Sequence, residues 1–84
     1  MAAKVVLYTT DWCGYCARAR ALLDERGVKY EDIDVDAVNG ARAQMRERSG
    51  RTTVPQIFIN EAHIGGADDL AALAADGRLD QLLK

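Results

Sequence analysis

The stretch Trp12-Cys13-Gly14-Tyr15-Cys16 contains both cysteines of the 84-residue chain. It follows a run of apolar, β-favouring residues at 5–8, and a helical pattern follows it from Ala17 to Arg26. Two thiols three residues apart, at a junction of strand and helix, are typical of redox chemistry. The first turn of a helix has unpaired N–H groups and a partial positive charge, which favour ionisation of a sulfur placed there.

Three interpretations compete for Cys13 and Cys16. Free cysteines are often small buried hydrophobes. A structural zinc site needs four ligands, usually cysteine or histidine. Besides Cys13 and Cys16 the chain has a single histidine, His63, so one chain alone does not complete such a site. Dithiol–disulfide exchange needs no more than two thiols. In that case we expect Cys13, at the helix start, to be the attacking thiol of low pKa, and Cys16, one turn further on the core side, to be the resolving thiol.

The composition indicates one small globular domain over residues 1–84. Hydrophobic residues make up 49% of the chain and charged residues 29%, a balance typical of globular proteins. A net charge of −2 leaves no basic surface for nucleic acid or anionic lipid. No apolar run approaches the ~18 residues of a membrane span, and the run after Lys4 is too short for a signal peptide. We expect a cytoplasmic protein.

Apolar periodicity and turn residues predict the element order βαβαββα. The expected strands are 5–8, 28–33, 56–59 and 62–64, and the expected helices are 17–26, 36–49, one opening at Asp68 and a short terminal one around Leu79. The first strand, helix and strand form a βαβ unit. We expect Asp36 to cap the second helix, and Val38, Ala41 and Met45 to lie on its buried face. The short turn Asn60-Glu61 predicts an antiparallel last pair of strands.

Three further motifs each allow a purely structural interpretation. Pro55 suits the first position of a strand, because proline does not donate to the ladder. Asp68 and Asp69 suit the capping of a helix. Gly65-Gly66 suits a turn with positive φ, or a place where a ligand approaches the backbone closely.

Together these motifs resemble the glutaredoxin family, in its dithiol class. The matching stretches are Cys13-Gly14-Tyr15-Cys16, Thr53-Val54-Pro55, Phe58-Ile59-Asn60 and Gly65-Gly66-Ala67-Asp68-Asp69-Leu70. The stretch 49–69 is especially similar to bacterial glutaredoxins of the third type. The resemblance implies an α/β protein with a thioredoxin fold. Its four-stranded mixed sheet would have the order 2-1-3-4, with the third strand antiparallel to the first and helices on its flanks.

The resemblance also implies a glutathione groove beside Cys13. The residues that it assigns to this groove are Tyr15, Thr53, Val54, Pro55, Gly66, Asp68 and Asp69. The backbone of Val54 would pair with the cysteinyl part of glutathione like an added strand, next to a cis Val54-Pro55 bond. Asp68 and Asp69, at a helix start, would receive the γ-glutamyl end, because helix N–H groups suit its carboxylate and an aspartate suits its ammonium.

Two residues depart from the family pattern. Thr10 stands where many members have a lysine that helps to ionise the thiol and meets the glycyl carboxylate. We therefore expect weaker glutathione affinity or a less depressed thiol pKa, with Arg51 or Arg42 as the substitute cation. Gly14 stands where proline is usual. In the family, loss of that proline is associated with members that hold a [2Fe–2S] cluster between two chains, through the first cysteine and bound glutathione.

The leading interpretation is an enzyme, a glutathione-dependent thiol–disulfide oxidoreductase that reduces protein disulfides and glutathione mixed disulfides. Cys13 and Cys16 would cycle between dithiol and disulfide, with glutathione as reductant and glutathione reductase as its indirect source of electrons. The chain would be monomeric, with no metal ligand and no nucleic-acid or membrane partner. The alternatives are a dimer that binds a [2Fe–2S] cluster through Cys13, and a redoxin fed by thioredoxin reductase.

Overall fold

The computed structural model describes residues 3–11 and 13–84. Its elements are β1 (Val5–Thr9), α1 (Gly14–Glu25), β2 (Glu31–Asp34), α2 (Ala41–Ser49), β3 (Gln56–Ile59), β4 (Ala62–Gly65), α3 (Ala67–Ala75) and α4 (Arg78–Leu82). The four strands form one sheet in the order β2-β1-β3-β4. β1 pairs parallel with β2 and antiparallel with β3, and β3 pairs antiparallel with β4. The expected fold class and strand order are confirmed.

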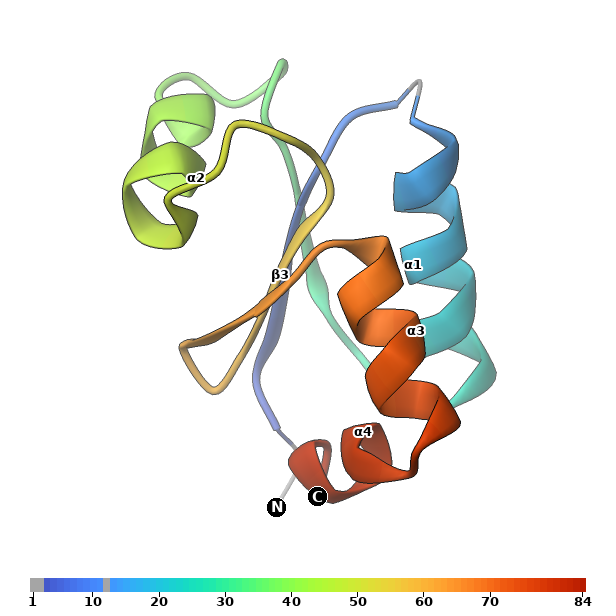
Figure 1. Ribbon diagram of the computed structural model, residues 1–84. Helices are drawn as coiled ribbons and strands as arrows, with labels where there is room; N and C mark the ends of the chain where they lie inside the picture. Colours follow the sequence, from blue (N-terminus) through green and yellow to red (C-terminus); the bar gives the residue numbers. More distant parts are fainter. Residues whose placement is uncertain (1–2, 12) are drawn as a thin grey trace.

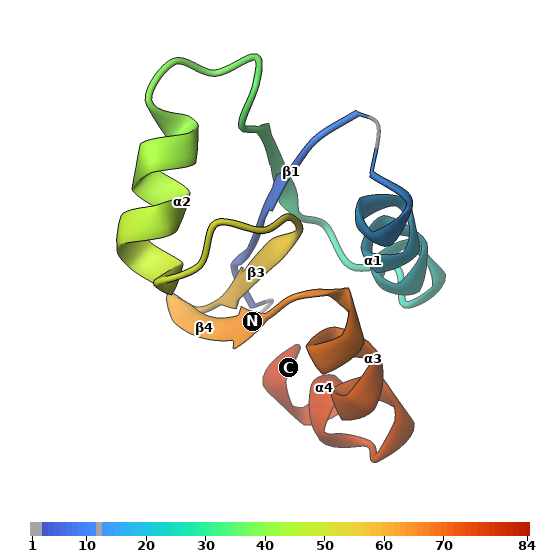
Figure 2. The ribbon, with the colours of Figure 1, turned by 45° about the horizontal axis from the view of Figure 1, so that its top comes forward.

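The helices lie on both faces of this sheet. Figure 1 shows α1 beside α3 on one face, with α2 on the other. The turned view of Figure 2 separates the layers more clearly, with α4 on the same side as α1 and α3. No helix in the part of the chain that the structure describes is long and apolar enough to cross a membrane.

The central strand β1 is buried along its whole length, from Val5 to Thr9. Successive side chains of a strand point to opposite faces, so both faces must be covered for a continuous apolar run to be buried. Val5 and Leu7 pack toward α1 and α3, whereas Val6 and Tyr8 pack toward α2. The apolar run before the two cysteines therefore places the loop that follows it at the carboxyl end of a strand held from both sides.

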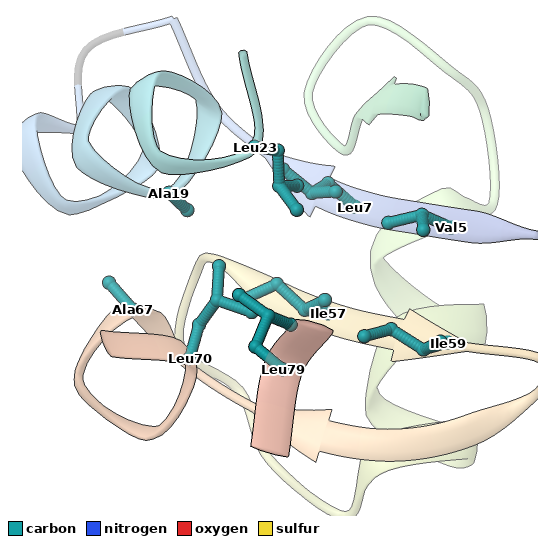
Figure 3. Close-up of a cluster of buried hydrophobic side chains, with 9 residues drawn as sticks. All are labelled: Val5, Leu7, Ala19, Leu23, Ile57, Ile59, Ala67, Leu70 and Leu79. Atoms are coloured by element: carbon teal, nitrogen blue, oxygen red, sulfur yellow. The ribbon is translucent and has the colours of Figure 1, made fainter. Parts of the chain in front are cut away.

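The larger hydrophobic cluster lies between the sheet and the layer of α1, α3 and α4. Figure 3 shows its members, which are Val5, Leu7, Ala19, Leu23, Ile57, Ile59, Ala67, Leu70 and Leu79. Ala19 and Leu23 follow Cys16 at helical spacing, and all three side chains are buried. The core side expected for Cys16 is therefore confirmed. This packing fixes the rotation of α1 about its axis.

The smaller cluster lies under α2. It consists of Val6, Tyr8, Val35, Ala41, Met45 and Phe58. The Tyr8 hydroxyl donates to the Gln44 Oε1 at 2.9 Å and accepts from the Arg48 Nη1 at 2.9 Å. The Arg48 guanidinium also lies 4.3 Å from the centre of the Phe58 ring. Polar groups at the edge of this cluster are thus paired.

The second strand is shorter than expected, because it begins at Glu31 and not at residue 28. β2 has a single neighbour, β1, and the pairing register runs from Val6 with Glu31 to Thr9 with Asp34. Residues 28–30 precede the first pair of this register and are not part of the ladder. Val28 and Tyr30 instead pack against the edge of the larger cluster.

The second helix begins at Ala41 and not after Asp36, so the predicted cap is wrong. The Asp34 Oδ1 accepts from the N–H groups of residues 36 and 37 and forms a turn there. Gly40, with φ +81°, ends that turn in a left-handed conformation that a helix does not continue. Val38 lies outside the helix and is 50% exposed, against the prediction, whereas Ala41 and Met45 are buried as expected.

The remaining boundaries differ by a few residues. α1 begins at Gly14, with Cys13 as its N-cap, so Cys16 lies in its first turn and Cys13 immediately before it. α3 begins at Ala67, one residue before the expected start. Helix ends that lack strong side-chain caps are difficult to place from sequence.

Truncating Met45 tests the position of the helix on this face. We expect Met45→Ala to lower the free energy of unfolding by about 2 to 4 kcal/mol, because the side chain is fully buried. Val38→Ala is the control. Because Val38 is half-exposed, this substitution should lower the free energy of unfolding by about 0.5 kcal/mol or less. Urea denaturation measures both, and equal losses would contradict the observed start of α2.

Candidate active site

Cys13 and Cys16 occupy two different environments on one turn of helix. Cys13 is the N-cap of α1 and has an extended backbone, with φ −94° and ψ 118°. Its carbonyl accepts from the N–H of Ala17 at 3.2 Å, the first bond of the helix. The Cys13 thiol is partly exposed, whereas Cys16 is fully buried, and both are free thiols. Trp12, which precedes them, lies outside the described residues.

The pKa of Cys13 is below its ordinary value. Burial opposes ionisation most strongly, but it is outweighed by hydrogen bonds from the backbone and thiol of Cys16 and from the backbone of Tyr15, together with the positive charge of Arg20. These donors lie at a helix N-terminus, where unpaired N–H groups are expected. Cys13 is therefore the thiol that ionises first.

The pKa of Cys16 moves in the opposite direction. The pKa of Cys16 is raised to about 11, chiefly by burial. A hydrogen bond from the backbone of Thr10 and the charge of Arg20 lower it, whereas the hydrogen bond and the charge of Cys13 raise it. Cys16 thus stays protonated while Cys13 is ionised. The two thiols differ in the way that an attacking and a resolving thiol must differ.

A groove of about 210 Å³ lies beside Cys13. Its lining residues are Tyr15, Arg51, Thr53, Val54, Pro55, Gly66, Ala67, Asp68 and Asp69. All seven residues that the resemblance assigned to a groove are among them. The Cys13 thiol donates to the carbonyl of Val54, with the Sγ 3.7 Å from the oxygen, and this contact joins the thiol to the groove. The Val54-Pro55 bond is cis, as expected.

A larger cavity lies elsewhere in the molecule. It measures about 590 Å³ and is lined by Ala3, Arg26, Gly27, Val28, Lys29, Asp80, Leu83 and Lys84. No thiol is among these residues. The smaller groove is the better candidate for a site because it adjoins the one thiol whose pKa is lowered.

Asp69 connects two of the chain segments that line the groove. Its Oδ2 accepts from the backbone N–H of Gly66 at 2.9 Å and from the Arg51 Nη1 at 3.2 Å. These two contacts, with the Gly66 bond the larger influence, hold the pKa of Asp69 below its usual range. The capping interpretation is therefore confirmed for Asp69. Asp68, its neighbour, is exposed at the first turn of α3 and faces the groove.

The two glycines before α3 have different roles. Gly65 has φ +125°, and a Cβ built there would collide with the Asp69 carboxylate. Gly66 is extended, with φ −93°, and its Cβ would make an ordinary contact of 3.5 Å with the Pro55 carbonyl. The positive-φ interpretation thus holds for Gly65 and is wrong for Gly66.

The two arginines expected to replace the missing lysine lie in different places. Arg51 lines the groove, whereas Arg42 does not and instead pairs with Asp36 at 2.7 Å. Sequence reasoning missed Arg20, which acts on both thiols. The available signal was its position four residues after Cys16, on the same face of a helix.

The pH dependence of alkylation tests the difference between the two thiols. Because the pKa of Cys13 is lowered, its rate of reaction with iodoacetamide should rise with pH to a plateau. The midpoint should lie below the value of about 8.5 for free cysteine. Cys16, buried and with a pKa of about 11, should remain unlabelled at neutral pH. Mass spectrometry of labelled Cys13→Ser protein is the control, and rapid labelling of Cys16 there would contradict this picture.

Alanine at the two glycines tests the geometry around Asp69. We expect Gly65→Ala to lower the free energy of unfolding by about 1 to 3 kcal/mol from backbone conformation alone. The collision with the Asp69 carboxylate adds to that loss. Gly66→Ala, in an extended conformation and with room for a methyl group, should change it by about 0.5 kcal/mol or less. Thermal or urea unfolding measures both, and a larger loss at Gly66 would refute the assignment.

Known proteins match this chain over nearly its whole length. A family model described as Glutaredoxin matches residues 5–64. The chain is 55% identical over 82 residues to Glutaredoxin 3 of Escherichia coli (strain K12), covering 98% of this chain and 99% of that protein. The solution structure of glutaredoxin from Brucella melitensis superposes with a TM-score of 0.86 at 53% identity, covering 99% of this chain and 90% of that one.

A third relative was solved with a ligand. The crystal structure of a buckwheat glutaredoxin–glutathione complex superposes with a TM-score of 0.89 at 33% identity, covering 96% of this chain and 76% of that one. The matches thus extend over the sheet, the helices and the dithiol loop alike. The chain belongs to the glutaredoxin family, whose members are thiol–disulfide oxidoreductases that act with glutathione.

Proposed function

We propose that residues 1–84 act as one domain in which Cys13 is the catalytic nucleophile and Cys16 the resolving thiol. The observation that carries this proposal is the asymmetry of the pair, because the thiol with the lowered pKa is also the one that reaches the surface. The substrates are glutathione mixed disulfides and protein disulfides. The chain accordingly cycles between a dithiol and a Cys13–Cys16 disulfide.

Reduction of a mixed disulfide uses Cys13 alone. The Cys13 thiolate attacks the sulfur of the bound glutathionyl group, and the protein thiolate leaves and takes a proton from solvent. A second glutathione, as thiolate, then attacks the glutathionyl sulfur on Cys13 and releases oxidised glutathione. Glutathione reductase and NADPH return that product to two molecules of glutathione.

Reduction of a protein disulfide also uses Cys16. Attack by Cys13 gives a mixed disulfide with the substrate and frees one substrate thiol. Cys16 then loses its proton and attacks the Cys13 sulfur, which forms the Cys13–Cys16 disulfide and frees the second substrate thiol. Two molecules of glutathione reduce this disulfide in turn.

The groove beside Cys13 is proposed as the glutathione site. The backbone of Val54 is at hydrogen-bond distance from the Cys13 sulfur, which suits pairing with the cysteinyl unit of the tripeptide. Tyr15, Thr53, Pro55 and Gly66 form the walls around it. A related protein solved as a glutathione complex supports this assignment.

The charged ends of glutathione suit the charged ends of the groove. The γ-glutamyl carboxylate suits the N–H groups that open α3, and its ammonium suits Asp68, which is exposed. Asp69 supports the site indirectly, because its carboxylate already accepts hydrogen bonds from Gly66 and Arg51. Arg51, which pairs with Asp69 at 3.2 Å, is the cation among the lining residues and is proposed to meet a carboxylate of the tripeptide, in place of the lysine that Thr10 replaces.

A reducing setting follows from this chemistry. The cycle needs a pool of reduced glutathione, so we propose the cytoplasm as the location and glutathionylated or disulfide-bearing proteins as partners. Within one chain, Cys16 is buried behind Cys13, so the reaction is complete in a monomer.

A [2Fe–2S] cluster held between two chains is the alternative. Within residues 3–11 and 13–84, no group of three or more His, Cys, Asp or Glu side chains is placed to hold a metal ion. Of the two cysteines in one chain, Cys13 is the one that is partly exposed, so the other ligands would have to come from a second chain and from glutathione. The residues of one chain do not by themselves form a cluster site. Brown colour after anaerobic purification with glutathione would favour the cluster-binding dimer.

Serine variants of the two cysteines test the proposed roles. In an assay that couples reduction of a small glutathione mixed disulfide to NADPH through glutathione reductase, Cys13→Ser should lose all measurable activity. Cys16→Ser should retain most of it, because glutathione resolves the intermediate. On a protein disulfide, Cys16→Ser should be strongly impaired.

The same assay separates the alternatives. Activity with thioredoxin reductase in place of glutathione and glutathione reductase would identify a redoxin of a different kind. An inactive Cys16→Ser variant beside an active Cys13→Ser variant would reverse the assigned roles. Circular dichroism of each variant establishes that the fold is retained.

A further inference from the structure

Arg20 lies in a small polar cluster that joins α1 to the sheet. Its Nε bonds the Asp32 Oδ2 at 2.6 Å, and its Nη2 donates to the Thr9 Oγ1 at 2.8 Å. Thr9 in turn donates to the Asp32 Oδ1. Thr9 is fully buried, and the Arg20 and Asp32 side chains are 26% and 31% exposed. The guanidinium is therefore fixed in orientation and partly withdrawn from water.

The cluster lies next to the dithiol loop. Thr9 and Asp34 pair at the carboxyl ends of the parallel strands β1 and β2, and the loop that leads to Cys13 leaves from this end. On α1, Arg20 follows Cys16 by four residues, so both are on one helix face. The loop positions 10–12 are Thr, Asp and Trp and contain no cation.

The titratable groups around Arg20 come from β2, from the segment before it and from α1. Asp32 of β2 faces it directly, Tyr30 lies in the segment before β2, and Cys16 precedes it on α1. The Tyr30 hydroxyl bonds the Asp24 Oδ1 at 3.0 Å and so is held at the rim of the cluster. The charge of Arg20 favours ionisation of both cysteines.

We propose that Arg20 is a positioning residue of the active site. Its guanidinium, held by Asp32 and Thr9, supplies a fixed positive charge that stabilises the thiolate of Cys13 and the thiolate that Cys16 must form to resolve a mixed disulfide. The inference rests on the proposed roles of the two cysteines. It extends those roles to a third residue that touches neither substrate nor glutathione.

The charge acts on the reduced form of the enzyme. A disulfide has no charge to stabilise, whereas a thiolate has, so a fixed cation shifts the equilibrium toward the reduced form. The backbone donors at the start of α1 contribute more to Cys13 than Arg20 does. The expected effect of removing the charge is therefore moderate and specific to the thiols.

The test compares Arg20→Gln with Arg20→Lys in the full chain. Absorbance at 240 nm against pH gives the thiolate fraction of Cys13, since Cys16 ionises only near pH 11. Below the midpoint, Arg20→Gln should lower that fraction about two- to fivefold, as expected for loss of one partly screened charge. In a glutathione redox buffer, the dithiol-to-disulfide ratio should fall by a similar factor. Arg20→Lys keeps the charge and should recover most of both.

Two further variants separate charge from packing. Arg26→Gln is the matched control, because Arg26 is also ion-paired, to Asp80 at 3.1 Å, and is 27% exposed, and it should change neither quantity. Asp32→Asn removes the negative charge that faces Arg20, so the thiolate fraction should stay the same or rise. A fall in Asp32→Asn as large as that in Arg20→Gln would show that packing of the cluster matters instead, and would overturn the proposal.

The outcomes for Arg20 and for Cys13 are distinct. A wild-type midpoint no lower than that of free cysteine would overturn the role of Cys13 itself. A low wild-type midpoint that Arg20→Gln leaves unchanged would overturn only the role of Arg20. Failure of Arg20→Lys to recover the thiolate fraction in a folded protein would likewise contradict a role based on charge.

Discussion

The burial of one helical stripe controls the chemistry of this protein. Cys16, Ala19 and Leu23 face the sheet, and their packing sets how α1 is rotated above β1. With Cys16 turned inward, Cys13 must emerge at the helix N-terminus, where unpaired N–H groups meet its sulfur. Hydrophobic packing and thiol ionisation are thus two results of the same arrangement.

The groove is assembled from segments that are distant in the sequence. Tyr15 comes from the first turn of α1, residues 51–55 from the loop before β3, and Gly66 to Asp69 from the start of α3. The sheet brings these segments together, because β1 and β3 are adjacent and antiparallel and α3 packs beside α1. Asp69 then ties two of them by its contacts with Gly66 and Arg51.

Local patterns predicted most of the fold, and long-range pairing accounts for the rest. The apolar run before the cysteines and the core side of Cys16 followed from local patterns. The length of β2, by contrast, depends on its pairing with β1, which a local stretch of sequence does not reveal. Val38 was misplaced because the left-handed Gly40 separates it from α2. The groove residues came from a family resemblance. Arg20 was missed because Asp32 lies twelve positions away in another element.

The burial of Cys16 has a consequence for oxidative damage. Peroxides attack thiolates far faster than protonated, shielded thiols, so they encounter Cys13 first. The sulfenic acid formed there has a second thiol within hydrogen-bonding reach, three residues further along the chain. Condensation of the two to a reversible disulfide competes with further oxidation of Cys13 to the irreversible sulfinic acid. The buried thiol of Cys16 thereby protects the partly exposed Cys13 from irreversible oxidation.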